Sequence, residues 1–300
     1  MENNFLYGII AVLAVMTAGL GWALWSLNQP PEFIEEPFVT IEEKIVEDEV
    51  VEENVIDEQT TGVVINVHIE PTSNPKETLE HWRTVQSIVE LSDDYEMKLS
   101  LHFSPSVAKF VAGSAENLDL VRSWEANGHE IAAHHHDPSH VEWDGYTNNT
   151  SRIGSRDYKG TVDELLEIVT ALTADGEILV GSGTKDGEEW PEGVIYGSAG
   201  GSPPSYEDLV GPAYQQTMGE TEVTFVTKAP FGVGMISASS NATYEHIAEA
   251  LEFVRDDEYL GLTLTNKTFT EETLADLEQV YQLFVVEGIQ TQTIENLLAP

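Results

Sequence analysis

The chain has 300 residues, with 53 Asp and Glu against 13 Lys and Arg, so its formal net charge is −40. This balance argues against a nucleic-acid partner, which needs a basic surface for phosphates, and against docking on anionic lipid through a basic patch. There is no Cys, which excludes disulfides, thiolate metal sites and a cysteine nucleophile, and the acids are spread along the whole chain, as in salt-adapted, halophilic proteins.

The N-terminal region is expected to anchor the chain in a membrane. After a short tail, residues 1–4, the 23 residues from Phe5 to Leu27 carry no charge, and they are long enough to cross a hydrocarbon core of about 30 Å. A cleaved signal peptide would start with Lys or Arg and have a shorter apolar core. The tail has no base, so we expect an uncleaved transmembrane anchor over 5–27.

An acidic linker is expected to follow the anchor. Residues 28–60 contain many Asp and Glu but only one base, Lys44, and like charges extend such a segment. Beyond it, a domain over 61–300 carries four Asn-x-Ser/Thr sequons, which support an outward-facing location. The sequence thus predicts a single-pass protein of the cell membrane with an extracellular domain.

The domain over 61–300 alternates short β-branched runs with stretches at helical spacing. Strands are expected over 62–70, 97–103, 130–133, 177–181, 194–196, 223–226, 259–264 and 289–293, and helices over 75–89, 107–126, 161–173, 244–254 and 271–286. Strands that alternate with helices indicate βαβ units and a parallel sheet. About seven such units favour a (β/α)7-type parallel barrel, with its site at the carboxyl ends of the strands.

Five of the nine His residues lie between His129 and His140, where the strand over 130–133 runs into a loop. Imidazoles at this density are candidate ligands for a first-row divalent metal, although a solvent-exposed His-rich loop is the alternative. If the strand continues, His134 and His136 point the same way and His135 points the opposite way.

The end of the first strand offers partners for this loop. His68 and Glu70 are two residues apart, so they share one face of the strand. Imidazole and carboxylate from neighbouring strand ends are what a hydrolytic zinc site needs. The sequence therefore predicts a shared site, with zinc as the expected metal.

One segment of the chain resembles a known family. Gly128-His129-Glu130-Ile131-Ala132-Ala133-His134 is similar to the Gly-His-Glu-Ile-x-x-His segment of NodB-like polysaccharide deacetylases. These are (β/α)7-barrel metalloenzymes that remove acetyl groups from sugars. A weaker resemblance extends from about Thr61 to the C-terminus. It implies a divergent, metal-dependent carbohydrate deacetylase or related hydrolase acting on C–N or ester bonds of acetylated glycans.

The chain departs from the family pattern at three places. The first family motif has paired Asp residues, where this chain reads His68-Ile69-Glu70-Pro71. The late catalytic His of the family falls at about Asn266. In the second motif three residues separate two His ligands, a spacing that from His134 lands on Pro138.

Two ligand pairs remain open. His134 pairs with His140 across a longer loop, or His136 and His140 keep the family spacing. The register from Gly128 favours His134 with His140, with His136 as the alternative and Glu70 as a further ligand.

The resemblance also implies roles for other residues. Glu70, or His68 with it, would take a proton or complete the ligand set. Trp143 and Tyr146, which follow the His loop, are expected to stack on sugar rings. Because the Asp pair and the late His are missing, a catalytically inactive glycan- or metal-binding protein on the same fold is the alternative. A metal-capture protein that uses only the His loop is a third.

Overall fold

The computed structural model describes residues 62–71, 74–183, 189–198, 210–218, 220–226, 244–255, 258–267 and 269–299. All of them belong to one compact unit, Ile56–Pro300. The predicted tail, anchor and linker, residues 1–60, lie outside the described residues. Among the residues that are described, no helix is both long and apolar enough to span a membrane.

The described strands form one ten-stranded sheet. Their bounds are β1 Gly62–Ile69, β2 Ser100–Phe103, β3 Glu130–His134, β4 Val180–Ser182, β5 Tyr196–Ser198, β6 Val210–Pro212, β7 Tyr214–Met218, β8 Thr221–Val226, β9 Glu258–Thr265 and β10 Thr291–Gln292. Seven of them, in the order β9-β1-β2-β3-β4-β5-β8, are parallel neighbours. β6 and β7 pair antiparallel at the two ends, and β10 pairs with β1. The fold is therefore mixed α/β with a barrel-like sheet.

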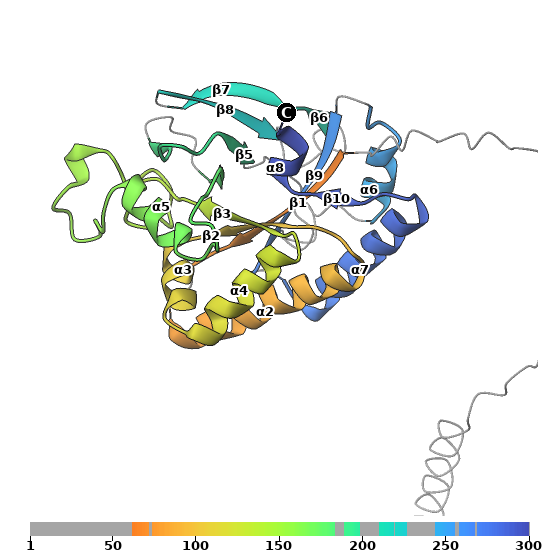
Figure 1. Cartoon of the computed structure of the whole chain (residues 1–300), viewed down its shortest axis with the longest axis horizontal. Coiled ribbons are helices and arrows are strands. Elements are labelled where there is room, and N and C mark those ends of the chain that lie inside the picture. Colours follow the sequence, from red (N-terminus) through yellow and green to blue (C-terminus); the bar gives the residue numbers. More distant parts are fainter. Residues whose placement is uncertain are drawn as a thin grey trace, which may run out of the picture. The chain divides into compact units, whose positions relative to one another are not determined.

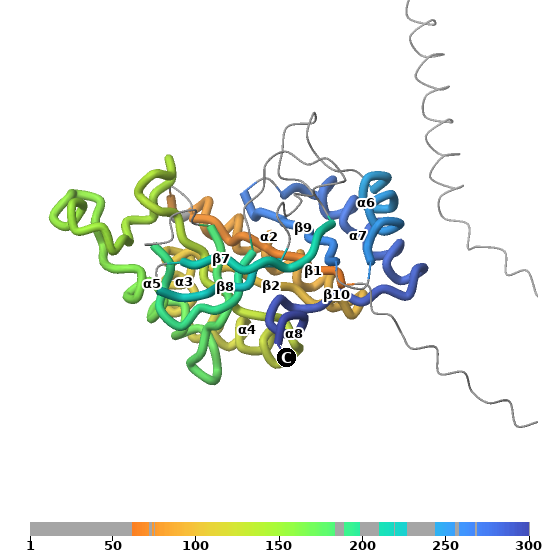
Figure 2. Tube along the Cα trace, turned by 90° about the horizontal axis from the view of Figure 1, so that it is seen from above, coloured from red at the N-terminus to blue at the C-terminus, as the bar shows by residue number. Residues whose placement is uncertain are grey.

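Several helices begin at residues whose side chains cap the first turn. Their bounds are α2 Pro75–Asp94, α3 Pro105–Ala112, α4 Ala115–Ala126, α5 Val162–Thr170, α6 Tyr244–Leu251, α7 Glu271–Val286 and α8 Ile294–Leu298, with a 3₁₀ turn at Thr150–Arg152. Asn74 accepts hydrogen bonds from the first turn of α2, and Thr161 forms a capping box with Glu164 at α5. Helices α2, α3, α4 and α7 lie along one side of the sheet, across it from the β7–β8 hairpin (Figures 1 and 2).

The expected alternation of strands and helices is interrupted between β4 and β8 and resumes with α6, β9 and α7. Between β4 and β8 the described residues contain no α-helix, and the hairpin of β7 and β8 takes that place. Sequence analysis missed β7 because three of its five residues are polar and exposed to solvent, so no apolar alternation indicates a strand.

The sheet separates two hydrophobic clusters. On its outer face Val63, Ile65, Val67 and Ile69 of β1 belong to the large cluster that the helices cover. On its inner face Val64 belongs to a small cluster with four residues from β3, β4, β8 and α8: Ala132, Val180, Val226 and Ile294. Because successive side chains of a strand point to opposite faces, the even-numbered residues of β1 face the barrel interior.

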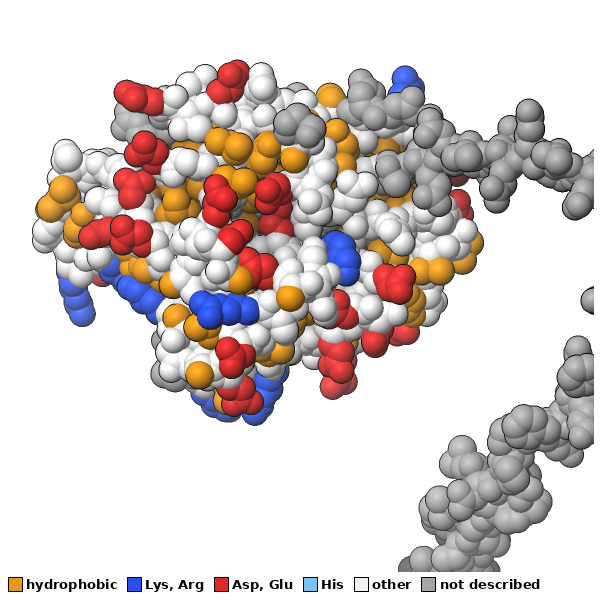
Figure 3. Space-filling model, viewed as in Figure 1, with side chains coloured by type: hydrophobic (Ala, Val, Ile, Leu, Met, Phe, Trp, Pro, Cys, Tyr) orange, Lys and Arg blue, Asp and Glu red, His pale blue; other side chains and the backbone are white. Residues whose placement is uncertain are grey.

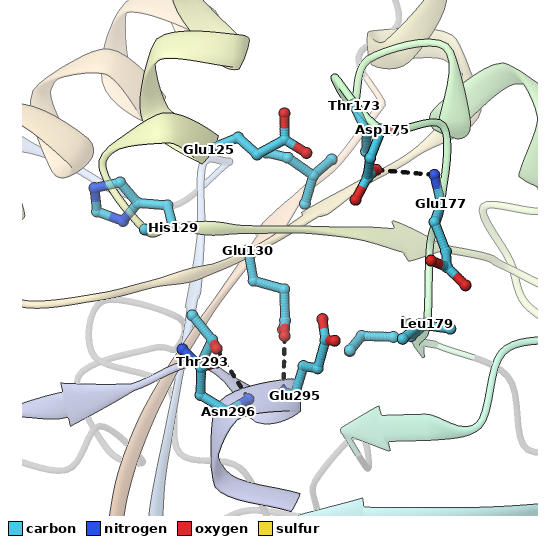
Figure 4. A pocket seen from close by; sticks show the side chains of 13 residues that line it. Glu125, His129, Glu130, Thr173, Asp175, Glu177, Leu179, Thr293, Glu295 and Asn296 are labelled. Atoms are coloured by element: carbon cyan, nitrogen blue, oxygen red, sulfur yellow. Dashed lines mark hydrogen bonds between the residues drawn. The ribbon is translucent and has the colours of Figure 1, made fainter. Parts of the chain in front are cut away.

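A cavity of about 250 Å³ opens at the amino ends of β3 and β4, the opposite end of these strands from the His loop. Its acidic lining residues are Glu125, Glu130, Asp175, Glu177 and Glu295 (Figure 4). Acidic side chains are also scattered over the face drawn in Figure 3, with few Lys and Arg among them. Carboxylates thus dominate the charged groups at this end of the barrel, where His129 is the imidazole among the lining residues.

Candidate metal site

Three side chains converge where β1 and β3 end. His134 Nε2 lies 3.0 Å from Glu70 Oε1 and 3.0 Å from His136 Nε2, and His136 Nε2 lies 3.5 Å from Glu70 Oε1. All three residues are buried. We call Glu70, His134 and His136 the triad. It fulfils the expectation that Glu70 meets the His loop, since carboxyl ends of parallel strands lie at one end of a barrel.

The second nitrogen of each triad imidazole is held by the surrounding chain. His134 Nδ1 lies 2.9 Å from Ser182 Oγ, and His136 Nδ1 donates to the Glu142 carbonyl over 3.2 Å. A carbonyl oxygen can only accept, so the neutral His136 ring carries its proton on Nδ1 and leaves Nε2 free as a ligand. Such outer contacts are what orient metal-binding His residues.

Close backbone approach explains the glycine that follows Ser182. Gly183 has φ +105°, and a Cβ on it would lie 2.9 Å from His134 Cε1 and even closer to the His135 carbonyl oxygen. Only glycine fits this position without moving the His134 ring. The end of β4 thus fixes the His134 ring in two ways: the Ser182 hydroxyl forms a hydrogen bond with it, and the backbone at Gly183 packs against it.

The spacing of the triad suits one metal ion. Ligands about 2.0–2.2 Å from a tetrahedral ion stand roughly 3.3 Å apart, close to the three triad separations of 3.0, 3.0 and 3.5 Å. Two imidazole nitrogens and a carboxylate oxygen are a donor set typical of catalytic zinc. The residues present therefore fit a divalent transition metal.

His68 lies beside the triad. Its ring centroid is 4.4 Å from that of His134 and 5.5 Å from that of His102 on β2, and a ligand atom of His68 groups with those of Glu70 and His134 within 4.8 Å. Its position agrees with the expectation that it shares the site. His102, which is fully buried, is the register partner of His68 on the neighbouring strand β2.

His140, which the sequence favoured as the partner of His134, occupies a different place. The chain turns directly after His136, and His140 accepts a hydrogen bond from Glu142 N through Nδ1. Its ring packs on that of His136 with centroids 4.0 Å apart. His140 belongs to no metal-ligand group among the described residues, whereas His136 takes the place beside His134. The two-residue periodicity of a strand explains this, because it continues past the end of β3.

The predicted sugar-stacking role of Tyr146 needs correction. Its side chain is only 2% exposed, its hydroxyl accepts a hydrogen bond from Lys109 Nζ, and it belongs to the main hydrophobic cluster. A ring buried in this way has no free face for a sugar. Trp143 is half-buried, donates from Nε1 to the Tyr146 carbonyl, and has Arg152 5.9 Å from its ring centroid.

The third imidazole of the run supports the loop from the other side. His135 Nδ1 lies 2.9 Å from Asp144 Oδ2, and its Nε2 lies 3.7 Å from Glu189 Oε2. Asp144 also accepts from His136 N, while Glu189 accepts from Thr147 Oγ1. His135 therefore points away from the triad, as the alternation predicted, and two buried carboxylates hold the loop in place.

Two residues after β9 complete the surroundings of Glu70. Glu70 N donates to Asn266 Oδ1 over 2.9 Å, and Asn266 Nδ2 donates to the Glu70 carbonyl over 3.4 Å. Lys267 Nζ lies 4.0 Å from Glu70 Oε2 and donates to Glu142 Oε2 over 2.6 Å. Glu142, Glu70 and His136 form a second ligand group, but the Lys267 ammonium already supplies a cation to its carboxylates.

Burial and mutual contact shift the pKa values of these groups. Burial opposes ionisation of Glu70, but the charge and hydrogen bonds of His134 and His136 outweigh it and lower the Glu70 pKa. Burial and the neighbouring imidazoles lower the pKa of His68 well below its usual value and that of His102 to about 3. Burial would lower the pKa of His135 too, but its hydrogen bond with Asp144 and the nearby carboxylate of Glu189 raise it to about 9.

Sequence reasoning missed most of the supporting residues. Asn266 and Ser182 lie just beyond the ends of predicted strands, but no motif assigns them a role, and Asp144, Glu189 and Lys267 lie in no motif. Their common signal is position, because Ser182 ends β4 and Asn266 follows β9 at the end of the barrel that holds the triad.

The known proteins to which this chain is similar are solved structures. No protein-family model matches the chain, and no curated protein matches it. Among solved structures, it is similar to a 4-alpha-glucanotransferase from Thermococcus litoralis, with 15% identity and a TM-score of 0.47; the match covers 80% of this chain but only 40% of that enzyme. A Mycobacterium smegmatis protein described as a polysaccharide deacetylase is similar at 11% identity and a TM-score of 0.49, over 80% of this chain and 90% of that one.

A third similar structure is a pseudoenzyme of carbohydrate esterase family 4 from Bacillus anthracis, with 12% identity, a TM-score of 0.40 and coverage of 80% of this chain and 66% of that one. The descriptions of the Mycobacterium smegmatis and Bacillus anthracis structures thus name a polysaccharide deacetylase and a carbohydrate esterase family 4 pseudoenzyme.

Proposed function

We propose that this protein is a metal-dependent hydrolase that removes acyl groups from a glycan. The observation that carries the proposal is the triad: two imidazole nitrogens and one carboxylate oxygen, all buried, at 3.0, 3.0 and 3.5 Å from one another. Acetylated sugar is the substrate class implied by the resemblance of residues 128–134 to polysaccharide deacetylases.

Glu70 Oε1, His134 Nε2 and His136 Nε2 would hold the metal, with zinc as the expected ion. When bound, such an ion polarises an acyl carbonyl and lowers the pKa of water toward about 7. Ser182 and the Glu142 carbonyl hold the two rings in the orientation that presents Nε2. The chain thereby supplies three ligands and leaves a further position for water or substrate.

Proton transfer is assigned to the second oxygen of Glu70. Glu70 Oε2 is buried without a hydrogen-bond partner and lies 4.0 Å from Lys267 Nζ. It takes the proton of the attacking water as the new C–O bond forms at the acyl carbon. The acyl C–N or C–O bond then breaks, and the same proton passes to the leaving nitrogen or oxygen, so the products are a carboxylic acid and the free amine or hydroxyl.

Two measurements on the purified full-length chain test the proposal. Metal analysis should find one equivalent of zinc per chain, and acetylated glycans should release acetate in its presence. His134→Ala should lose both the metal and the activity, whereas His246→Ala, on α6, should keep both. A wild-type chain that binds no divalent metal would overturn the proposal.

A non-catalytic binding protein is the second candidate, and Asn266 is the observation that favours it. The family's late catalytic His falls at about this position, and here the amide is fully engaged with the backbone of Glu70. An amide held in this way neither donates nor accepts a proton in catalysis. Stoichiometric zinc and glycan binding without acetate release would establish this alternative.

We further propose that residues 5–27 anchor the protein in the cell membrane and that 61–300 faces outward. The uncharged length of 5–27 and the acidic composition of 28–60 support this arrangement. Cell fractionation and protease treatment of intact cells test it: the chain should sediment with membranes, and external protease should cut within 30–60. A soluble or protected chain would refute the topology.

A further inference from the structure

Polar side chains fill the part of the barrel interior next to the triad. The inner face of β1, β2 and β9 alternates with the outer face, whose odd-numbered β1 residues belong to the main hydrophobic cluster. Its inner-facing residues are Asn66 and His68 on β1, Ser100 and His102 on β2, and Thr263 and Thr265 on β9. Three neighbouring strands thus turn polar groups inward where a barrel interior is usually apolar.

These side chains lie side by side in the sheet. Asn66 pairs with Ser100 on one side and with Thr263 on the other, and His68 pairs in the same way with His102 and Thr265. Ser104, one residue beyond β2, continues the inner face next to Glu70. The polar surface therefore runs without interruption from Asn66 and Thr263, inside the barrel, to the triad at its mouth.

Most of these groups have no hydrogen-bond partner in the described protein. Both amide atoms of Asn66 lack one, as do the hydroxyls of Thr263, Thr265 and Ser104 and the Nε2 of His68. All five residues are more than nine-tenths buried. Leaving one such group unsatisfied costs about 1–3 kcal/mol, and more than 90% of buried polar groups in proteins have a partner. Five residues with unsatisfied buried groups, so close together in the sheet, therefore indicate a hydrogen-bond partner that they share.

We propose that this part of the barrel, which we call the polar chamber, holds a chain of ordered water molecules that reaches the triad through His68. The unpartnered lining groups are hydroxyl, amide and imidazole groups, so they suit a small neutral molecule that both donates and accepts. The buried carboxyl of Glu130, the register partner of Ser100 on β3, lies at the inner end of the chamber, away from the triad. Buried water typically makes about three hydrogen bonds. The row of residues around Asn66 and the next row around His68 each contain three polar side chains, which offer that number.

The chamber also has a use that rests on the proposed function. Hydrolysis consumes one water at each turnover, and the triad residues are themselves at most 9% exposed. A glycan that covers the mouth shields the triad from outside solvent. Water held behind His68 can replace the consumed molecule from within the barrel.

Thr→Val variants of the full-length chain test the chamber without requiring activity or bound zinc. Valine has the shape of threonine but no hydroxyl. If water bonds to the hydroxyl, Thr263→Val and Thr265→Val should each lower the melting temperature by about 2–4 °C. If the hydroxyls have no partner, removing them relieves an unsatisfied group and raises the melting temperature. Unchanged or raised values in both variants would overturn the proposal.

Thr291→Val is the matched control. Its hydroxyl donates to the Lys98 carbonyl over 2.7 Å and accepts from Lys98 N over 2.6 Å, so its loss must lower the melting temperature. Magnetic relaxation dispersion of water provides the second measurement. The wild type should show long-lived internal water, and Asn66→Leu or, if that variant does not fold, Thr263→Val should reduce its amount. An identical dispersion profile in wild type and variant would contradict the chamber. A chain that shows the water but no turnover would refute only the hydrolase proposal.

Discussion

The side-chain amide of Asn266 pairs with the backbone of Glu70 as a neighbouring strand would. Its Oδ1 accepts from Glu70 N, and its Nδ2 donates to the Glu70 carbonyl. The backbone N of Asn266 also donates to the His68 carbonyl over 3.3 Å. Glu70 lies just beyond β1, where sheet pairing no longer holds the chain, so this clamp fixes the direction in which the carboxylate leaves the strand.

We expect Asn266→Ala to weaken zinc binding by about 10–100-fold, the usual effect of removing a group that orients a metal ligand. Titration against a chromophoric chelator measures it. Asn117→Ala is the matched control, because that amide accepts a hydrogen bond from Trp82 Nε1 on the outer helices and should leave zinc affinity unchanged. Equal affinity in Asn266→Ala and wild type would show that Glu70 needs no clamp.

The choice between His136 and His140 is testable with two single variants. His136 Nε2 faces both other triad atoms, while His140 Nδ1 accepts from the Glu142 backbone. His136→Ala should therefore remove most of the bound zinc, and His140→Ala should keep stoichiometric metal. Elemental analysis after gel filtration decides the matter. Loss of metal in His140→Ala with retention in His136→Ala would restore the pairing that the family register favoured.

Much of the fold could be predicted because its parallel strands are short apolar runs between amphipathic helices. The helix over 271–286 is confirmed by α7, and the helical stretch over 107–126 forms α3 and α4, which are divided at Gly113 and Ser114. β7 could not be predicted, because three of its five residues are exposed to solvent and show no apolar alternation, whereas its partner β8 contains the predicted strand over 223–226. Hydrophobic periodicity reflects which residues are buried, so a solvent-exposed strand has no clear hydrophobic pattern in the sequence.

The candidate metal site, too, could be predicted from the sequence only in part. That Glu70 and His134 meet follows from barrel topology, since both end parallel strands. The ligand pair depends on the path of the loop from Asp137 to His140, which spacing alone does not determine. The clamp joins Glu70 and Asn266, 196 positions apart in the chain, and no local pattern indicates such a contact.

Gly183 should be indispensable for the position of His134. In Gly183→Ala the new methyl would meet His134 Cε1 at 2.9 Å and the His135 carbonyl oxygen, at a backbone φ of +105°. Gly193→Ala is the matched control, since Gly193 has a φ of +88° and no atom within 4 Å of its Cβ position. Both variants bear the cost of a left-handed alanine, about 1 kcal/mol.

Only Gly183→Ala should also displace the ring. We expect its melting temperature to fall further than that of Gly193→Ala and its zinc affinity to fall with it, both measured on the same preparations. If the two variants lost equal stability and bound zinc equally well, the contact with His134 would have no role in the site.

Glu130, at the far end of β3 from the triad, should make stability depend on pH. It is buried beside the acidic cavity, where Oε1 accepts from Glu295 N and Oε2 has no partner (Figure 4). Burial raises the pKa of this carboxyl from 4.5 to about 7. The folded state therefore binds its proton more tightly than the unfolded state does. The resulting stabilisation is complete below about pH 4.5 and is lost as the pH rises through about 7.

A pKa shift of this size corresponds to a change of about 3 kcal/mol in the free energy of unfolding between low and high pH. Glu130→Gln should remove this pH-dependent contribution, because glutamine does not titrate, while its side-chain oxygen still accepts from Glu295 N. Denaturant unfolding between pH 5 and 8 at fixed salt measures the difference in unfolding free energy between wild type and variant, which cancels the titration of the other groups. The variant should gain stability relative to wild type as the pH rises, with most of the change complete near pH 7. A difference that does not vary with pH over this range would mean that Glu130 is ionised at an ordinary pKa in the folded protein, with its charge solvated by the cavity.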